Sequence, residues 1–469
     1  MKPVFLFITI FFSLQLFAQK QTNLAARLTG LDTAFARVLK TNKAAGFAVA
    51  VIDRNKVIYS KGFGYSDYEN KTPVTPNTVF AIGSCTKAFT AGLLGLLNKD
   101  GKVDFDKPVE TYLPELKFYN NDLNNNATLR DMMCHRTGLP RHDMSWYFFT
   151  TSNRDSLVQR IQYLEPSATL RQRWQYNNFM FMLQGVVTEK LTGKSWEDNI
   201  KERFFKPLGM SRSTVSYEDW MKTNDIAVGY TVKNDSLIDR LDYYKINGMA
   251  PAGSIASSAN DMSKWVTAWV NGGKYNGVEI LPAGYAAEAI SSQMVINGAL
   301  PTTEQPDVYF ATYGFGWFLS SYRGHYRVEH GGNIDGFSAS ASFFPTDSVG
   351  IVVLCNQDGS SLPSIVRNLV ADKLLDLKYI DWTTKVLREK EKGKRAAKEA
   401  EKLQVKDTAT RYPATHLLQS YTGVFENKGY GKFQIKVVHD SLMSIQSLRP
   451  VYLRHKTYDV YDLLIKNKN

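Results

Sequence analysis

The chain is poor in cysteine: its 469 residues include only Cys85, Cys134 and Cys355. An exported protein held together by disulfides usually carries more cysteines, and in even number. We therefore expect free, buried thiols, most clearly for Cys355, which ends an apolar run. A bridge between Cys85 and Cys134 is the alternative that the sequence leaves open.

Metal-binding patterns are missing as well. The sequence has no Cys-x-x-Cys pair, and its seven histidines do not form a ligand set. His325 and His330 are five residues apart without a third ligand, and an odd separation on one strand turns two side chains to opposite faces. We expect no metal site and no cofactor.

Long apolar runs are absent except at the N-terminus, where Lys2 precedes a run from Val4 to Leu14. This run is too short to span a bilayer and has the shape of a secretory signal with a cut after Ala18. We predict a signal peptide over residues 1–18, a periplasmic or secreted mature protein and no membrane span after cleavage. An uncleaved anchor is the minor alternative.

The positive charge is unevenly distributed. The net charge is +12, but the segment from Lys385 to Lys406 alone holds nine Lys or Arg and four Glu. A solvated helix explains this segment better than a binding patch does, because no nucleic-acid-binding motif accompanies it. We therefore expect no nucleic-acid partner.

The remaining pattern predicts a mixed α/β protein. Two apolar-rich segments joined by Asp53-Arg54-Asn55 indicate a hairpin, and further strand patterns return near the end of a long, mainly helical middle. The expected elements are helices over 24–39, 85–97 and 361–377, and strands over 46–52, 56–64, 314–319, 326–330, 337–344 and 350–355. We predict a main domain over 19–378, a charged helical linker over 379–410 and a small β-rich domain over 411–469.

A serine and a lysine open the buried helix in "AIGSCTKAFT", as Ser84-x-x-Lys87. Side chains three residues apart share one helix face, so the lysine amine can reach the serine hydroxyl. The helix N-terminus also favours negative charge that develops at the serine. By itself, however, the string fits an ordinary buried helix start equally well.

Two later strings change this balance. "WQYNNF" contains Tyr176-x-Asn178 before an amphipathic helix, and "VEHGGN" places His330-Gly331-Gly332 at the end of a strand. A tyrosine can act as a base if cationic neighbours lower its pKa, and an asparagine can orient a lysine and a substrate carbonyl. Paired glycines leave backbone N–H groups free for an oxyanion.

In this order, the three strings resemble the motifs of the serine β-lactamase and D-alanyl-D-alanine peptidase superfamily. The branch is the one that includes class C β-lactamases, esterases and D-amino-acid peptidases. The stretches Met132–Pro140 and Pro251–Trp265 also resemble recurrent family stretches, and the resemblance covers about Leu24 to Leu377. It implies a mainly antiparallel sheet flanked by helices plus an all-helical lobe, followed here by the small C-terminal β domain.

The resemblance also implies roles for the motif residues. Ser84 would attack a carbonyl to give an acyl-enzyme, while Lys87 and Tyr176 would share the transfer of its proton. Asn178 would hold Lys87 and a substrate amide. Which of Lys87 and Tyr176 is the working base is left open, and we treat them as a coupled pair.

The third motif carries both the oxyanion site and a departure from the family. The resemblance implies an oxyanion hole from the backbone N–H groups of Ser84 and Asn333, the latter directly after Gly332. Class C β-lactamases have Lys-Thr-Gly where this chain has His330-Gly331-Gly332, without the hydroxyl and with little positive charge at pH 7. The loss of the cation and the hydroxyl weakens the binding of a substrate carboxylate.

We therefore expect an exported serine hydrolase that acts on an ester, a lactone, an amide or a short D-amino-acid peptide. A D-alanyl-D-alanine carboxypeptidase or weak β-lactamase is the alternative within the class. A catalytically idle binding or assembly protein is the alternative outside it. The partner is a small molecule or short peptide, and the sequence does not set the oligomeric state.

Three further features carry weaker expectations. His135 is expected to hydrogen-bond the backbone, and the aromatic cluster Trp146–Thr151 to form either core or a pocket wall. The C-terminal β domain is expected to support the catalytic domain by packing on it, with a lid or substrate-binding role as the alternative.

Overall fold

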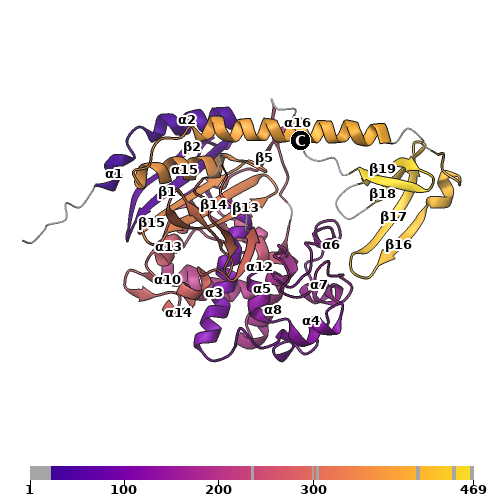
Figure 1. Ribbon diagram of the computed structural model, residues 1–469, viewed down its shortest axis with the longest axis horizontal. Helices are drawn as coiled ribbons and strands as arrows, with labels where there is room; N and C mark the ends of the chain where they lie inside the picture. The colour runs from indigo at the N-terminus through magenta and orange to yellow at the C-terminus, as the bar shows by residue number, and fades with distance from the viewer. Residues whose placement is uncertain are drawn as a thin grey trace, which may run out of the picture.

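The computed structural model describes residues 23–233, 237–243, 245–297, 300–302, 306–407, 412–445 and 450–464. At its centre lies a nine-stranded sheet with the order β10-β11-β12-β13-β14-β15-β1-β2-β3, in which every neighbouring pair is antiparallel (Figure 1). The strands are β1 (Gly46–Asp53), β2 (Lys56–Asp67), β3 (Thr72–Pro73), β10 (Met294–Asn297), β11 (Ala311–Tyr313), β12 (Phe318–Tyr322), β13 (His325–Ile334), β14 (Phe337–Phe344) and β15 (Val349–Cys355).

Strand β1 divides the hydrophobic core in two. Ala48, Ala50 and Ile52 contact the larger core cluster, and the residues that alternate with them contact the smaller one. Side chains of a strand alternate between the two faces of a sheet, so a continuous apolar run indicates burial on both faces. The run GFAVAVI therefore places β1 in the interior of the sheet, between β15 and β2.

Helices cover both faces of this sheet. On one face α2 (Leu31–Asn42) packs against α15 (Leu362–Leu374), and on the other α13 (Ala259–Val270) packs against β15 and β1. The short helix α1 (Leu24–Arg27) precedes α2. This arrangement confirms the predicted antiparallel sheet flanked by helices.

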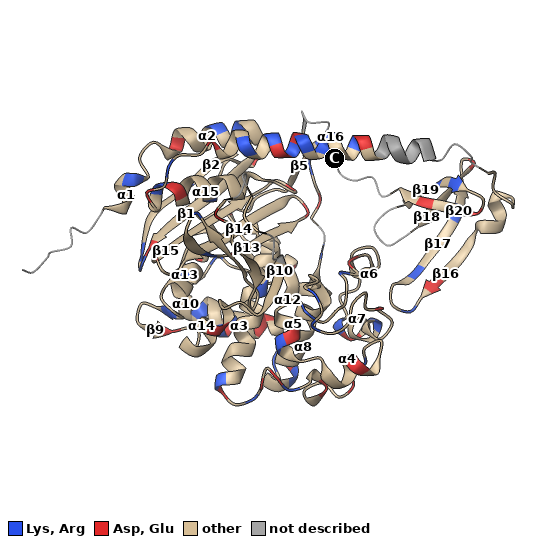
Figure 2. Cartoon of the chain, in the orientation of Figure 1, with Lys and Arg blue, Asp and Glu red and all other residues tan. Residues whose placement is uncertain are grey.

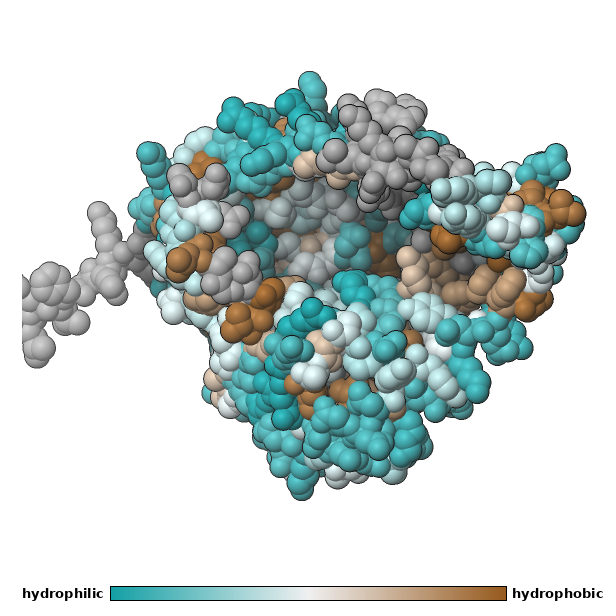
Figure 3. Space-filling model, turned by 45° about the vertical axis from the view of Figure 1, so that its right-hand side comes forward, coloured by the Kyte–Doolittle hydropathy of each residue, from teal (hydrophilic) through white to brown (hydrophobic). Residues whose placement is uncertain are grey.

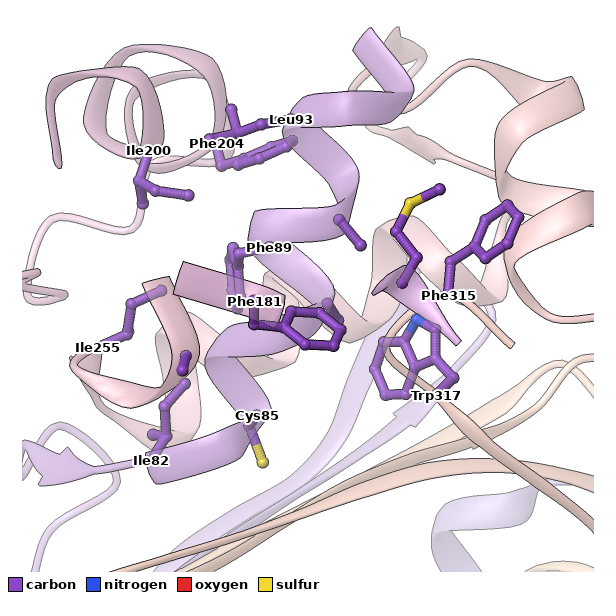
Figure 4. Packing of buried hydrophobic residues seen from close by; sticks show 14 of the residues in the cluster. Ile82, Cys85, Phe89, Leu93, Phe181, Ile200, Phe204, Ile255, Phe315 and Trp317 are labelled. Atoms are coloured by element: carbon purple, nitrogen blue, oxygen red, sulfur yellow. The ribbon is translucent and has the colours of Figure 1, made fainter. Parts of the chain in front are cut away.

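A mainly helical lobe is inserted between β3 and β10. Phe89 of α3 stacks on Trp265 with 3.9 Å between ring centroids, and Phe181 and Phe204 lie close to the same helix (Figure 4). The lobe contains α3 (Thr86–Lys99), α4 (Asn121–Asn126), α5 (Leu129–Met133), α6 (Met144–Tyr147), α7 (Arg154–Ile161), α8 (Asn178–Thr192), α9 (Trp196–Ile200), α10 (Lys206–Leu208), α11 (Tyr217–Met221), α12 (Ala250–Gly253) and α14 (Ala283–Ala289).

The lobe is not purely helical, which corrects part of the expectation. It carries the two-stranded sheets β4–β7 (Phe80–Ala81 with Ala256–Ser257), β5–β6 (Tyr230–Lys233 with Leu237–Arg240) and β8–β9 (Lys274–Tyr275 with Val278–Glu279). Strand β4 lies shortly before the helix that carries Lys87, so its pairing with β7 helps to fix the start of that helix.

The C-terminal part consists of one long helix and a separate sheet. Helix α16 (Trp382–Asp407) carries many charged side chains, as Figure 2 shows, and it corresponds to the predicted charged helix. It leads to the five-stranded antiparallel sheet β16 (Gly423–Asn427), β17 (Gly431–Val438), β18 (Ser441–Ile445), β19 (Pro450–Thr457) and β20 (Val460–Leu464). The exact domain boundaries stay a prediction.

Two predicted elements are wrong in detail. The helix predicted over 24–39 is divided into α1 and α2 at Gly30, which has a φ of 84°, a left-handed conformation that suits glycine. Of the strand predicted over 314–319, only residues 318–319 are strand, at the start of β12; residues 314–317 form a turn between β11 and β12, closed by a hydrogen bond from Gly314 N to the carbonyl of Trp317. The predicted signal peptide lies outside the described residues.

The three cysteines lie as expected from the sequence. Cys85, Cys134 and Cys355 are free and buried, so the alternative bridge is not formed. Within the described ranges, no helix is both long and apolar enough to cross a bilayer.

Candidate active site

Ser84 lies where the helical lobe meets the central sheet. It belongs to a 3-10 turn, Gly83–Cys85, that continues directly into α3, so its side chain stands at the N-terminus of a 14-residue helix. Every residue from Val79 to Gly95 is buried except Ser84, which keeps partial access to solvent. A single reachable hydroxyl in a buried segment is the placement that a nucleophile requires.

Lys87 reaches the Ser84 hydroxyl one turn later. Its Nζ lies 3.0 Å from Ser84 Oγ, 2.8 Å from Asn178 Oδ1 and 2.7 Å from the carbonyl oxygen of Ala252. The two carbonyl oxygens can only accept hydrogen bonds, so they occupy both N–H groups of a neutral amine. The remaining lone pair is then directed at the serine hydroxyl.

Burial favours this neutral form of Lys87. The side chain is fully buried, and desolvation lowers the pKa of its amine well below the usual lysine value. The charge of Arg141 lowers the pKa further, whereas Asp143 opposes the shift. An unprotonated amine next to a serine hydroxyl can accept its proton.

Tyr176 borders the same hydroxyl but has the opposite protonation preference. Its ring lies 4.8 Å from Lys87 Nζ and 4.9 Å from the guanidinium of Arg141. Desolvation raises the pKa of its phenol above the usual value, although a hydrogen bond with Ser84 and the charge of Arg141 act against this. The phenol therefore stays protonated at neutral pH and can donate a proton.

Asn178 links Lys87 to a carboxylate, that of Asp143, which was not predicted from the sequence. Asn178 is the first residue of α8, which is capped by the side chain of Asn177. Its Oδ1 accepts from Lys87, and its Nδ2 donates to Asp143 Oδ1 over 2.9 Å. Asp143 thus fixes the orientation of the Asn178 amide.

Asp143 itself is held from two sides. It accepts a hydrogen bond from Trp146 Nε1 at 2.9 Å and forms an ion pair with Arg141, whose Nε lies 2.6 Å from Asp143 Oδ2. The only sequence signal for these residues was the string Arg141-His142-Asp143 directly after Gly138-Leu139-Pro140. A loop of this kind shows no periodicity that would reveal its partner.

Close backbone contacts join the nucleophile to β13. A Cβ on Gly332 would lie 1.9 Å from the carbonyl oxygen of Ile82 and 3.3 Å from Ser84 N, so no side chain fits there. Gly83 has a φ of 49°, and a Cβ on it would lie 2.9 Å from Asn333 N. The turn that carries Ser84 and the strand that carries Asn333 are therefore in direct contact. That their backbone N–H groups form the oxyanion hole stays a prediction.

His330 is buried next to this contact and is neutral. Its Nδ1 lies 2.6 Å from the carbonyl oxygen of Gly331 and must donate to it, so Nε2 accepts from the hydroxyl of Tyr313 at 2.9 Å. Desolvation lowers the pKa of His330 to about 3. It therefore supplies no positive charge at the position where β-lactamases have lysine.

These groups open into one cleft of about 820 Å³. Trp174 and Phe318 form an apolar wall, and serine hydroxyls from β14 and the start of α15 form a polar one. Ser84, Tyr176, His330, Gly331, Gly332 and Asn333 all line the cleft, whereas Lys87 and Asn178 lie behind Ser84.

The remaining marked residues lie as follows. His135 is buried, and its Nδ1 accepts from the backbone N–H of Asn177, as expected. Phe148 and Phe149 of the aromatic cluster line a second cavity, beside the C-terminal sheet rather than beside Ser84. Within the described residues, no group of three or more His, Cys, Asp or Glu could hold a metal ion.

The fold, an antiparallel sheet with a mainly helical lobe, and the site together define a serine hydrolase. The Beta-lactamase family model matches residues 31–375, and the chain belongs to this family. The roles of the individual site residues stay predictions that the geometry makes specific.

Known proteins extend this comparison. The chain is 33% identical over 374 residues to an unguisins hydrolase of Aspergillus campestris. This alignment covers 75% of this chain and 67% of that protein. Its fold is similar to the octameric penicillin-binding protein homologue from Pyrococcus abyssi, with a TM-score of 0.68, 22% identity and 90% of each chain covered. It is also similar to D-amino acid amidase from Ochrobactrum anthropi, with a TM-score of 0.60, 22% identity and coverage of 74% and 98%.

Proposed function

We propose that the protein hydrolyses an uncharged ester or amide through an acyl-enzyme on Ser84. The observation that carries the proposal is the contact of Lys87 Nζ with Ser84 Oγ, with both amine N–H groups taken up by Asn178 and Ala252. A fully buried amine held in this way has its lone pair free for only one proton, that of the serine hydroxyl.

This geometry supports the following sequence of steps. Ser84 Oγ bonds to the substrate carbonyl carbon while Lys87 takes its proton, and the oxyanion lies at the N–H groups of Ser84 and Asn333. The bond to the leaving group then breaks as the leaving oxygen or nitrogen receives a proton from Tyr176, which Lys87 reprotonates. Water next attacks the ester carbonyl of the acylated Ser84, and its proton passes to the same pair. The bond between the carbonyl carbon and Ser84 Oγ then breaks, Oγ takes this proton back, and the acid is released.

Two charge features support an uncharged substrate over one with a required carboxylate. His330 is neutral, and its pKa of about 3 keeps it so. Arg141 and Arg367 line the cleft, but Arg141 is paired with Asp143 and Arg367 with Glu329. A carboxylate would therefore meet a cation only in competition with an acidic side chain that is already bound to it.

The names of similar proteins point in the same direction. The relative from Aspergillus campestris is named as a hydrolase of unguisins, and one neighbour in fold is named as an amidase of D-amino acids. An amide is thus the first substrate class to test, with the ester as the more reactive analogue.

The test compares three substrates on the wild type and on Ser84→Ala. We expect hydrolysis of p-nitrophenyl acetate and of N-acetyl-D-phenylalanine amide by the wild type, loss of both in Ser84→Ala, and little turnover of benzylpenicillin. Faster turnover of benzylpenicillin than of the amide would favour a cell-wall peptidase or β-lactamase. No hydrolysis of any of the three would contradict the proposal and favour a binding protein.

We also propose that the protein is exported. The support is the apolar run from Val4 to Leu14 and the small residue Ala18 at the expected cut. Expression of the full chain in a bacterial host should yield protein in the periplasmic fraction that begins at Gln19. Retention of residues 1–18 in the cytoplasmic fraction would contradict this.

A further inference from the structure

The five-stranded C-terminal sheet lacks a filled core of its own. Among the described residues of β16–β20, only Leu442, Ser444 and Val451 are buried. A sheet normally buries one apolar face against another element. Here large side chains stay accessible, as Phe425 is 42% and Leu463 39% exposed.

The apolar residues of this sheet border a cavity of about 690 Å³. Phe425 and Phe433 stack with 5.5 Å between ring centroids, and Phe149 from the catalytic domain lies 6.3 Å from Phe433 on the other side. Figure 3 shows the molecule hollowed between its two parts, with hydrophobic residues on the C-terminal sheet beside this hollow. The volume lies in the range of pockets that hold small molecules.

The two sides of the cavity are fastened to each other by polar contacts. Ser145 Oγ donates to the carbonyl oxygen of Gly429 over 2.6 Å, and His142 Nδ1 lies 2.8 Å from the Tyr430 hydroxyl. His142 Nε2 lies 3.0 Å from the carbonyl oxygen of Glu165, so Nε2 donates there and Nδ1 accepts from Tyr430. These contacts hold the segment of α6 over the sheet and keep the cavity in place.

The lining indicates the charge of an occupant. No Lys, Arg or His is among the described residues that line the cavity, so an anion would find no counter-charge. The one carboxylate, Asp459, already accepts from the backbone and hydroxyl of Thr415 and from the Tyr421 hydroxyl.

We propose that this cavity is a binding site for an uncharged, apolar small molecule. An aromatic or alkyl group would cover the exposed rings and complete the core that the sheet lacks.

Occupancy of the cavity is also linked to the catalytic lysine. Met144 and Phe148 line the cavity, and Asp143 directly precedes Met144 in the chain. Asp143 holds Asn178, which in turn holds Lys87. A ligand that packs on residues 144–149 therefore stabilises the position of Asp143 and raises the reactivity of Ser84; this step rests on the proposed function.

The binding step is tested with N-phenyl-1-naphthylamine, an uncharged aromatic probe whose fluorescence rises in apolar surroundings. The full chain should bind it saturably, and Phe425→Asp should weaken binding at least about tenfold, since it buries a charge in the site. Val424→Asp is the matched control: it places the same charge on the neighbouring residue of β16, which is 67% exposed and does not line the cavity. Ser420→Trp narrows the cavity from an exposed position and should also weaken binding.

The outcomes are distinct. Equal probe binding by wild type, Phe425→Asp and Ser420→Trp would overturn the site, and so would the absence of saturable binding. If Phe425→Asp lowers the melting temperature, Ser420→Trp decides the question.

Coupling is tested by the rate at which a fluorophosphonate labels Ser84. Saturating probe should raise the labelling rate about twofold or more in the wild type and in Val424→Asp, but not in Phe425→Asp. An unchanged rate in the wild type would overturn the coupling. The absence of any labelling would instead contradict the proposed function and leave the probe-binding result intact.

Discussion

Asp143 accepts a hydrogen bond from Asn178, with 2.9 Å between Oδ1 and Nδ2, and thereby turns the Asn178 oxygen toward Lys87. The amide could otherwise rotate and present its NH2 group to the lysine. A loop carboxylate thus sets the direction of a hydrogen bond on which the neutral amine depends. It acts on the reaction through Asn178 and not by touching Ser84.

Replacing this carboxylate should slow catalysis without abolishing binding. We expect Asp143→Ala to lower kcat roughly 10- to 100-fold with little change in KM, because the lysine is misplaced and not removed. Asp143→Asn keeps an acceptor oxygen and should retain more activity. Asp155→Ala, an exposed acidic residue on α7, is the control and should match the wild type in ester hydrolysis. Equal kcat in Asp143→Ala and Asp155→Ala would rule out the positioning role.

The rate should depend on pH through Lys87. Its pKa is lowered by burial, so the amine becomes the active, neutral base as pH rises through that lowered value, and the rate reaches its plateau at a lower pH than an ordinary lysine would give. Protonation of the amine removes activity on the acid side. Tyr176, whose pKa is raised, stays protonated across the plateau. His330, with a pKa of about 3, contributes only at strongly acid pH.

The measurement is kcat/KM for ester hydrolysis against pH, corrected for spontaneous hydrolysis. If kcat/KM rose with pH only near the usual lysine pKa of about 10.4, Lys87 would be protonated in the free enzyme at neutral pH, which would contradict the account.

Two neighbouring glycines should respond differently to the same substitution. Gly332→Ala places a Cβ 1.9 Å from the Ile82 carbonyl oxygen, so β13 and the turn of Ser84 must separate. We expect a loss of about 1–3 kcal/mol in the free energy of unfolding. Gly331→Ala is the control, since its Cβ would find its nearest neighbour at 3.6 Å. Thermal unfolding compares the two, and equal melting temperatures would show that the contact carries no strain.

The cysteines should be inert in the folded protein. Burial raises the pKa of Cys85, Cys134 and Cys355 to about 12, so their thiols are neutral at pH 8. We expect no reaction with Ellman's reagent until the protein is unfolded in urea, when three thiols react. Lys392→Cys, at an exposed position of α16, provides a reactive control in the folded state. Rapid reaction of a native thiol would contradict the described burial.

Local sequence patterns predicted the parts of the fold that depend on neighbours in the chain. The turn Asp53-Arg54-Asn55 and the apolar runs beside it predicted the β1–β2 hairpin. The spacing of Ser84 and Lys87 predicted the contact between their side chains. The turn after Tyr313 was missed because an apolar composition alone does not separate a strand from a buried turn.

The rest of the site could not be predicted because it depends on loops that meet only in space. Asp143 and the Ala252 carbonyl lie far from Lys87 in the sequence, and neither belongs to a periodic pattern. The pKa directions of Lys87 and Tyr176 depend on burial by surrounding elements, so the sequence left the choice of base open. The cavity beside the C-terminal sheet likewise arises from the contact of two parts of the chain.

The most direct test of the central claim is the intact mass of the protein after exposure to a fluorophosphonate. The wild type should gain one adduct, Ser84→Ala none, and Ser360→Ala, which removes another hydroxyl of the same cleft, should gain it like the wild type. Labelling should also be slowed strongly in Lys87→Ala, where the base is lost. An adduct that persists in Ser84→Ala would contradict the assignment of the nucleophile.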